Sequence, residues 1–123
     1  MNYNFKKFEE THGRYESRIT VTGSKSIGFP TRFFKDNDID SYKYVTLFYD
    51  EDKMVVGIKF LSDEGEPHKF TIVKSKDGYG GSIIASSFFG KYAIDTKKYK
   101  GKYDWKKEIT PFGELYVIEL KEK

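Results

Sequence analysis

The chain of 123 residues contains no cysteine, so disulfide bonds and thiolate metal sites are excluded. Small secreted domains commonly depend on disulfides, and their absence favours an intracellular, cytoplasmic protein. The chain also lacks any apolar run long enough to cross a bilayer, and its N-terminal stretch lacks the apolar centre of a signal peptide. We therefore expect neither a membrane span nor secretion through a standard signal.

Histidine is also scarce, since only His12 and His68 occur and neither belongs to a metal-binding or nucleophile-elbow motif. Carboxylates gather at Asp50–Asp52, but a hairpin turn is predicted there and water would surround them. The three aspartates from Asp36 to Asp40 lack the glycine and the distal glutamate of a calcium-binding loop. We therefore expect a protein that is not an enzyme and that holds no metal or cofactor.

Proline, with three residues, and tryptophan, with one, are rare, whereas ten tyrosines and eleven phenylalanines raise the aromatic fraction to 18%. Aromatic side chains suit strands better than helical bundles. A chain of this length forms one domain with a core of moderate size. The composition therefore predicts a single, mainly β domain with short helices.

The stretch from Ser17 to Phe60 contains the clearest secondary-structure signals. Alternating apolar residues and the turn at Gly23-Ser24 predict two short strands. Pro30 favours the first turn of a helix, because its fixed φ suits that position and it needs no backbone donor there. An acidic turn after Asp50 joins two further β-rich runs into a hairpin. The predicted elements are strands at Arg18–Val21 and Ser26–Phe29, a helix at Thr31–Asn37, and strands at Tyr44–Tyr49 and Val55–Phe60.

This order of elements resembles the AbrB/MazE/SpoVT swapped-hairpin DNA-binding family. The resemblance rests on the step Gly28-Phe29-Pro30, on Ile39 nine residues after the proline, and on a valine-rich hairpin that ends at Lys59-Phe60. In that family two units from two chains interlock into one barrel. Basic residues of the first strand, the following loop and the helix contact DNA there.

Carried over position by position, the resemblance implies DNA contacts at Arg18, Lys25 and Lys35. Phe34 stands where the family often has a second helix arginine, which departs from the family pattern. Together with Arg32, the three basic residues would reach phosphates or base edges from one side of the barrel. The alternative is a solvated polar face, in which the nearby aspartates balance these four cations.

The second half of the chain repeats the pattern of the first at a spacing of 55 residues. Phe33-Phe34, Ile39-Asp40 and Tyr44 recur as Phe88-Phe89, Ile94-Asp95 and Tyr99. We interpret this as a tandem duplication, with repeat one at 16–60, a linker at 61–67 and repeat two at 68–123. Because one unit would leave an apolar face uncovered, the second unit would cover it within the same chain. Phe33 and Phe88 would then be equivalent core residues.

The predicted fold is therefore a pseudo-twofold cradle-loop β-barrel, mainly β with short helices, built from two ββαββ-like repeats. In repeat two, Phe70–Lys74 and Leu115–Leu120 would supply the first and last strands. Residues 1–15 would form an N-terminal extension, a strand or short helix packed against the barrel. The protein would be a monomer with a pseudo-dimeric fold, or a homodimer.

Positive charge gathers in the second half, where residues 68–123 carry a net charge of +5 against 0 for residues 16–60. Seven lysines lie in Lys91–Lys107, interleaved with three tyrosines and Trp105. One interpretation is that the lysines bind phosphates while the aromatics stack on bases. The other is an edge strand with its aromatics inward and its lysines outward. Residue alternation favours the edge strand, and its lysine face remains available to DNA in either case.

The segment Lys74–Gly81 places Lys74 and Lys76 beside three glycines. Such a segment can cradle a phosphate through its backbone amides, but it lacks the Gly-Lys-Ser/Thr sequence of a P-loop. A flexible hairpin loop is therefore the favoured interpretation, and such a loop could still fold onto DNA.

These observations predict a small non-enzymatic DNA-binding protein, an AbrB-like transcriptional regulator or a DNA-architectural protein, with duplex DNA as the favoured partner. The alternative is a protein-interaction module on the same barrel, whose partner would dock on exposed aromatics such as Phe29, Phe112 or Tyr116. The predicted DNA-binding residues are Arg18, Lys25, Arg32, Lys35, Lys74, Lys76, Lys97, Lys98 and Lys100.

Overall fold

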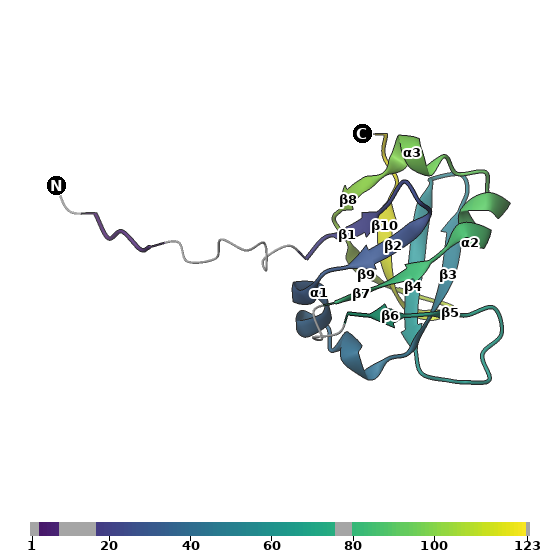
Figure 1. Cartoon of the computed structure of the whole chain (residues 1–123), viewed down its shortest axis with the longest axis horizontal. Coiled ribbons are helices and arrows are strands. Elements are labelled where there is room, and N and C mark those ends of the chain that lie inside the picture. The colour runs from purple at the N-terminus through teal and green to yellow at the C-terminus, as the bar shows by residue number, and fades with distance from the viewer. Residues whose placement is uncertain (1–2, 8–16, 76–79, 123) are drawn as a thin grey trace.

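The computed structural model describes residues 3–7, 17–75 and 80–122, and these form two antiparallel five-stranded sheets with a few short helices (Figure 1). The strands are β1 (Ile19–Val21), β2 (Ser26–Phe29), β3 (Tyr44–Asp50), β4 (Val55–Leu61), β5 (Phe70–Thr71), β6 (Val73–Lys74), β7 (Gly81–Ile84), β8 (Gly101–Tyr103), β9 (Lys106–Thr110) and β10 (Gly113–Glu119). The helices are α1 (Thr31–Asp36), the 3-10 helix η1 (Ile39–Ser41), α2 (Ser86–Lys91) and α3 (Thr96–Tyr99). The prediction of a mainly β protein with short helices is confirmed.

The first sheet has the strand order β6-β7-β2-β1-β8, and the second has the order β5-β3-β4-β10-β9. Two segments contribute to both sheets. Phe70–Lys74 supplies β5 to the second sheet and β6 to the first, and Gly101–Thr110 supplies β8 to the first and β9 to the second. The chain therefore passes from one sheet to the other at both edges.

The core lies between the sheets, and strands of both sheets contribute residues to it. The isoleucines and valines that are completely or almost completely buried there include Ile19, Val21, Ile27 and Ile83 of the first sheet and Val45, Val56, Ile58 and Ile118 of the second. At one end of this core Phe33 of α1 packs against Trp105, Tyr116 and Phe60, with ring centroids 5.1, 5.1 and 5.8 Å away. Many of the aromatic side chains therefore pack against one another in the core.

The first-half elements follow their predicted positions closely. Strand β2 has its predicted bounds, and β1, α1, β3 and β4 differ from prediction by one residue at an end. The β3–β4 hairpin closes as the acidic turn indicated, because the carboxylate of Asp50 accepts the backbone N–H groups of Asp52 and Lys53 at 3.1 and 3.2 Å. A side chain that satisfies turn amides in this way explains why the turn begins at an aspartate.

The two halves place the same features 55 residues apart. Helix α2 begins 55 positions after α1, and β2 and β7 have the same spacing and pair with each other in the first sheet. Positive φ values also recur at this spacing, at Lys25 (68°) and Gly80 (91°), and at Asp38 and Ala93 (both 53°). Residues other than glycine seldom adopt such angles. Two of the unusual turns of the first half thus recur in the second, whereas the positive φ values at Met54, Gly101 and Gly113 have no counterpart at this spacing.

The segment Lys91–Lys107 is not one edge strand, contrary to the alternation argument. It contains α3, then β8, then a break before β9. The helix begins here because the carboxylate of Asp95 caps it, accepting the N–H groups of Lys97 and Lys98 at 3.1 and 3.3 Å. Beyond the helix the alternation holds, since Tyr103 is buried and Lys102 is exposed.

The predicted packing of the N-terminal extension is wrong for its described part. Residues 3–7 have no helix or strand, and all five are exposed; Phe5 is 86% exposed. The remaining residues of the extension lie outside the described residues. Within the described ranges, no helix has the length and apolar character needed to span a membrane.

Candidate nucleic-acid interface

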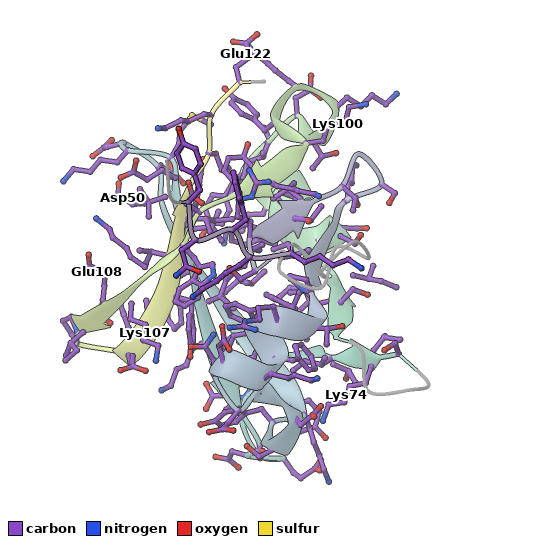
Figure 2. All side chains as sticks on the ribbon, turned by 90° about the vertical axis from the view of Figure 1, so that its left-hand side faces the viewer. Asp50, Lys74, Lys100, Lys107, Glu108 and Glu122 are labelled. Atoms are coloured by element: carbon purple, nitrogen blue, oxygen red, sulfur yellow. The ribbon has the colours of Figure 1, made fainter. Side chains whose placement is uncertain are left out.

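The predicted DNA-binding residues lie at two ends of the molecule. Antiparallel pairing of β1 and β2 places Arg18, which precedes β1, and Lys25, in the intervening turn, at opposite ends of their hairpin. The expectation that these residues act from one side does not fit this placement. Figure 2 likewise shows Lys74 and Lys100 at opposite ends of the protein. Lys76 lies outside the described residues.

At the end that carries α1, two of the three basic side chains have a partner on the protein. The guanidinium of Arg32 lies 3.1 Å from the carboxylate of Asp36, one helical turn away, with both side chains about half exposed. Lys74 donates from Nζ to the backbone oxygen of Asp40 at 2.5 Å. Lys35, on the same helix, is exposed. This arrangement agrees with the solvated polar face that the sequence left as an alternative.

The other end gathers four exposed lysines, which we call the lysine end: Lys25, Lys97, Lys98 and Lys100. Two parts of the chain far apart in sequence meet there. Thr96 of α3 donates from Oγ1 to the backbone oxygen of Gly23 at 3.1 Å, across 73 residues. A Cβ on Gly23 would lie 3.7 Å from Cδ of Lys100. The turn that carries Lys25 therefore packs directly on the segment that carries the other three lysines.

Few acidic groups oppose the lysine end. Asp95 lies beside it, but its carboxylate is engaged in capping α3. Glu122 approaches Lys98, with 3.8 Å between Oε2 and Nζ. Because Asp95 already satisfies the first N–H groups of α3, attraction of an anion to this end comes from the lysine side chains and not from the helix backbone.

The turn at the lysine end, Thr22–Lys25, is held by its own hydroxyl groups. Thr22 Oγ1 lies 3.0 Å from Ser24 Oγ and 2.7 Å from Ser26 Oγ. The backbone oxygen of Lys25 accepts the N–H of Ala85 at 2.9 Å, which ties the turn to the start of α2. Lys25 has a φ of 68°, where a side chain costs about 1–2 kcal/mol relative to glycine. A lysine thus occupies a position whose backbone favours glycine.

We expect Lys25→Gly to raise the free energy of unfolding by about 0.5–1 kcal/mol, because relief of the left-handed strain exceeds the entropic cost of glycine. Urea unfolding followed by circular dichroism measures this change. Lys97→Gly is the matched control, since glycine within α3 is expected to destabilise by about 1 kcal/mol. A loss of stability in Lys25→Gly would show that the lysine stabilises its own turn.

A cleft of about 320 Å³ lies where β8 turns into β9, at the other end of β8 from Lys100. Trp105 is held at this turn because its Nε1 donates to the backbone oxygen of Ser17 at 2.8 Å. Tyr103 Oη lies 2.9 Å from the backbone oxygen of Lys121, which fixes the C-terminal segment against β8. The cleft is lined by Arg18, Lys102, Tyr103, Asp104, Trp105, Lys106, Val117, Glu119 and Lys121.

The charge of this cleft comes from its lysines, its arginine and its two carboxylates. Burial raises the pKa of the Tyr103 phenol, and burial raises the pKa of Tyr116, which packs on Trp105, to about 12. Both phenols are therefore neutral at physiological pH. Four cations against two carboxylates leave the described lining with an excess of positive charge.

Sequence reasoning placed Lys102 and Lys106 on the outer face of a strand but did not join them to Lys121 or Arg18. The four cations come from three separate parts of the chain, and only the fold brings them to one cleft. The sequence feature that could have indicated this cleft is that Trp105, the one tryptophan of the chain, has lysines close to it in the sequence. Within the described residues, no cluster of three histidine, aspartate or glutamate side chains is suited to hold a metal ion.

The glycines of the Lys74–Gly81 segment that the structure describes have a packing role. A Cβ on Gly80 would lie 2.3 Å from the backbone oxygen of Phe29, and one on Gly81 would lie 2.8 Å from that of Val73. Close approach of backbone to backbone therefore requires glycine at both positions. The rest of the predicted loop, residues 76–79, lies outside the described residues.

Comparison with protein-family models, with curated proteins and with solved structures finds no match for this chain. The resemblance to the AbrB/MazE/SpoVT family therefore stays a prediction from the residues that carry it.

Proposed function

We propose that the chain is a small, non-enzymatic DNA-binding protein that holds duplex DNA through its lysine end. The observation that carries this proposal is the packing of the Thr22–Lys25 turn on α3, which gathers four exposed lysines with few opposing carboxylates. Lysines arranged in this way attract phosphates and displace the counterions of the duplex. Such contacts position DNA without reading its sequence.

The fold that we propose for this function is a cradle-loop barrel of two ββαββ-like repeats related by a local dyad. Pairing of β2 with β7 supports it: Ser26 pairs with Ile84 and Phe29 with Gly81. A shift of 55 residues relates Ser26 to Gly81 and Phe29 to Ile84, so the proposed dyad would exchange the two pairs. The positive φ values shared by the two halves, and a chain that passes between the sheets at both edges, agree with the same architecture.

The two ends that the proposed dyad relates differ in charge. Under the proposed dyad, the turn that carries Lys25 corresponds to the segment before β7, and the region of α3 corresponds to the region of η1. At the 55-residue spacing Lys97 corresponds to Tyr42 and Lys100 to Val45, and Lys25 corresponds to Gly80, whereas Lys98 keeps a basic counterpart in Lys43. One end of a pseudo-symmetric molecule thus carries the lysines, and we propose that this end faces DNA.

Fluorescence anisotropy of a short labelled duplex, at two or more salt concentrations, tests the proposal. We expect log affinity to fall with log salt with a slope of roughly −3 to −4, as three or four phosphate contacts require. Reversal of Lys25, Lys97 and Lys100 to Glu should lower affinity roughly 100-fold and make the slope shallower by about 3.

The matched control reverses Arg32, Lys35 and Lys74 at the opposite end, which changes net charge by the same amount. It should alter affinity by less than about threefold at physiological salt, because screening weakens charges farther than a Debye length from the DNA. Equal losses in both triple variants would show an effect of net charge alone. A larger loss in the control would place the DNA at the α1 end.

A protein-interaction module remains a second candidate because one apolar patch is exposed on the second sheet. The side chain of Phe112 is 60% exposed and packs on Phe48, with 4.7 Å between ring centroids, and Ile109 is 87% exposed. The other aromatics expected at a docking surface, Phe29 and Tyr116, are buried in the core, so that part of the expectation is wrong. A complex that persists at high salt and is lost in Ile109→Asp would favour this function.

A further inference from the structure

We propose that the cleft at the β8–β9 turn binds a single unpaired nucleotide, with its base against Trp105 and its phosphate held by Lys106 and Lys121. This inference rests on the proposed DNA-binding function and names a second, adjoining contact. The chemistry required is a base with an attached phosphate. Two sources can supply it, a free mononucleotide or an unpaired nucleotide of a DNA strand.

The size and lining of the cleft fit such a ligand. A volume of about 320 Å³ is at the lower end of the range for small-molecule sites. Trp105 contributes an aromatic surface to a lining whose other members are mainly charged. Aromatic surfaces beside basic side chains are the usual means of holding an unpaired nucleotide, since the base stacks while the cations neutralise the phosphate.

Trp105 is fixed before any ligand arrives. Its indole N–H is bonded to Ser17, and its ring meets Phe33 at 90° and Tyr116 at 66°, with centroids 5.1 and 5.3 Å away. A side chain held from these directions loses little conformational freedom when a base stacks on it. The same contacts leave part of the residue exposed in the cleft lining.

The charged groups divide between the two parts of the ligand. Lys106 and Lys121 line the cleft from β9 and from the C-terminal segment, and the ammonium group of Lys106 lies 3.5 Å from the carboxylate of Glu108. Ammonium groups form charge-assisted hydrogen bonds to phosphate oxygens, and in the proposed complex the phosphate replaces Glu108 as the partner of Lys106. The carboxylates of Asp104 and Glu119 line the same cleft. Carboxylates accept hydrogen bonds from the exocyclic amino group of cytosine. A nucleotide whose base bears an amino group therefore meets complementary groups at both ends.

The cleft adjoins the lysine end through the C-terminal segment. Lys121, which lines the cleft, is followed by Glu122, which lies 3.8 Å from Lys98 of α3. Figure 2 shows Glu122 and Lys100 at the same end of the molecule. Lys102 of β8, two residues after Lys100, lines the cleft as well. A strand bound by the lysine end can thus continue into the cleft along the C-terminal segment, on which Glu122 is already paired with Lys98.

Trp105 also makes the inference testable, because it is the one tryptophan in the chain and its fluorescence reports on the cleft. The probe is deoxycytidine 5′-monophosphate, titrated into the full chain, with equilibrium dialysis as a second measure of binding. We expect saturable quenching of Trp105, with deoxycytidine and inorganic phosphate each binding at least about tenfold more weakly. An unchanged Trp105 signal together with no retention in dialysis would overturn the proposal, as would equal binding of phosphate alone.

Variants assign the binding to this cleft. Lys106→Glu and Lys121→Glu should each weaken nucleotide binding at least about tenfold, which is the loss expected when a charge-assisted phosphate contact becomes a repulsion. Lys107→Glu is the matched control, because Lys107 is the next residue of β9 and its ammonium lies over the ring of Tyr116 instead. Circular dichroism confirms that each variant is folded. Equal weakening in all three variants would overturn the assignment.

Two further measurements distinguish a free mononucleotide from a nucleotide of a DNA strand, and distinguish failure of the cleft proposal from failure of the proposed function. If a short oligodeoxycytidine binds far more tightly than the mononucleotide, and reversal of Lys25 and Lys100 removes this gain, the ligand is part of a DNA strand. Equal affinities identify a free mononucleotide. Duplex binding that survives in Lys106→Glu while nucleotide binding is absent throughout would refute the cleft alone. Nucleotide binding without duplex binding would refute the proposed function of the lysine end alone.

Discussion

Phe33→Ala is expected to lower the free energy of unfolding by about 4–5 kcal/mol, and Phe88→Ala by about 3 kcal/mol. The two residues occupy corresponding positions of α1 and α2, so the sequence alone predicted comparable costs. Their surroundings differ. Phe33 is completely buried, whereas Phe88 is 7% exposed.

The neighbours of each ring explain the difference. Phe33 packs against Phe29, Phe60, Trp105 and Tyr116, which belong to both sheets and to the turn between them. Loss of its ring leaves a cavity whose walls are fixed by strand pairing and cannot collapse. Each well-oriented aromatic pair also contributes about 0.5–1.5 kcal/mol beyond the burial of area.

Phe88 has a more adaptable setting. Its ring meets Tyr49 at 5.7 Å, Tyr92 at 5.3 Å and its neighbour Phe89 at 5.4 Å, and both tyrosines are partly exposed. Side chains at the surface can move into the space left by alanine and reduce the cost of the cavity. Helices α1 and α2 therefore cover two ends of a core whose packing differs between those ends.

Urea unfolding followed by far-UV circular dichroism measures both changes without dependence on Trp105, which contacts Phe33. Phe5→Ala is the control: it removes an equal ring from an exposed position and should change stability by less than about 0.5 kcal/mol. Equal costs at Phe33 and Phe88 would show that the two ends of the core are packed alike. A larger cost at Phe88 would contradict the described packing.

The sequence predicted the first-half elements well because their signals are local. Pro30 determines where α1 begins, and Asp50 satisfies the amides of the hairpin turn. Helix α3 was missed because its lysines and tyrosines also match strand alternation. Its start depends on one capping residue, Asp95, that follows a positive φ at Ala93. A cap of this kind is seen in a sequence only when a helix is already expected there.

Burial and the candidate site were harder to predict. Strand alternation separates two faces of β10 but does not say that Tyr116 faces the core, because Leu115 and Val117 of the opposite face are buried too. The lysine end depends on a hydrogen bond between Thr96 and Gly23, which are 73 residues apart. The sequence identifies the lysines as candidates, but only the packing of the Thr22–Lys25 turn on α3 shows which of them lie together.

Gly80→Ala is expected to lower the free energy of unfolding by about 3–5 kcal/mol, through a left-handed backbone and a collision with fixed main-chain atoms. Gly80 has a φ of 91°, which disfavours any side chain. A Cβ there would lie 2.3 Å from the backbone oxygen of Phe29 and 3.1 Å from the backbone nitrogen of Thr31. These atoms belong to the step from β2 into α1 and cannot move without disturbing both elements.

Gly90→Ala supplies a control of opposite sign. Apart from its own helix backbone and chain neighbours, a Cβ on Gly90 of α2 would meet no atom within 4 Å, so alanine should stabilise the protein by about 0.5–1 kcal/mol through its helix propensity. Lys25, the counterpart of Gly80 in the first half, already carries a side chain at a similar φ. The large cost at Gly80 must therefore come mainly from the collision with Phe29 and Thr31. If Gly80→Ala costs no more than about 1–2 kcal/mol, the strain of φ alone explains it and the close approach of these backbones is wrong.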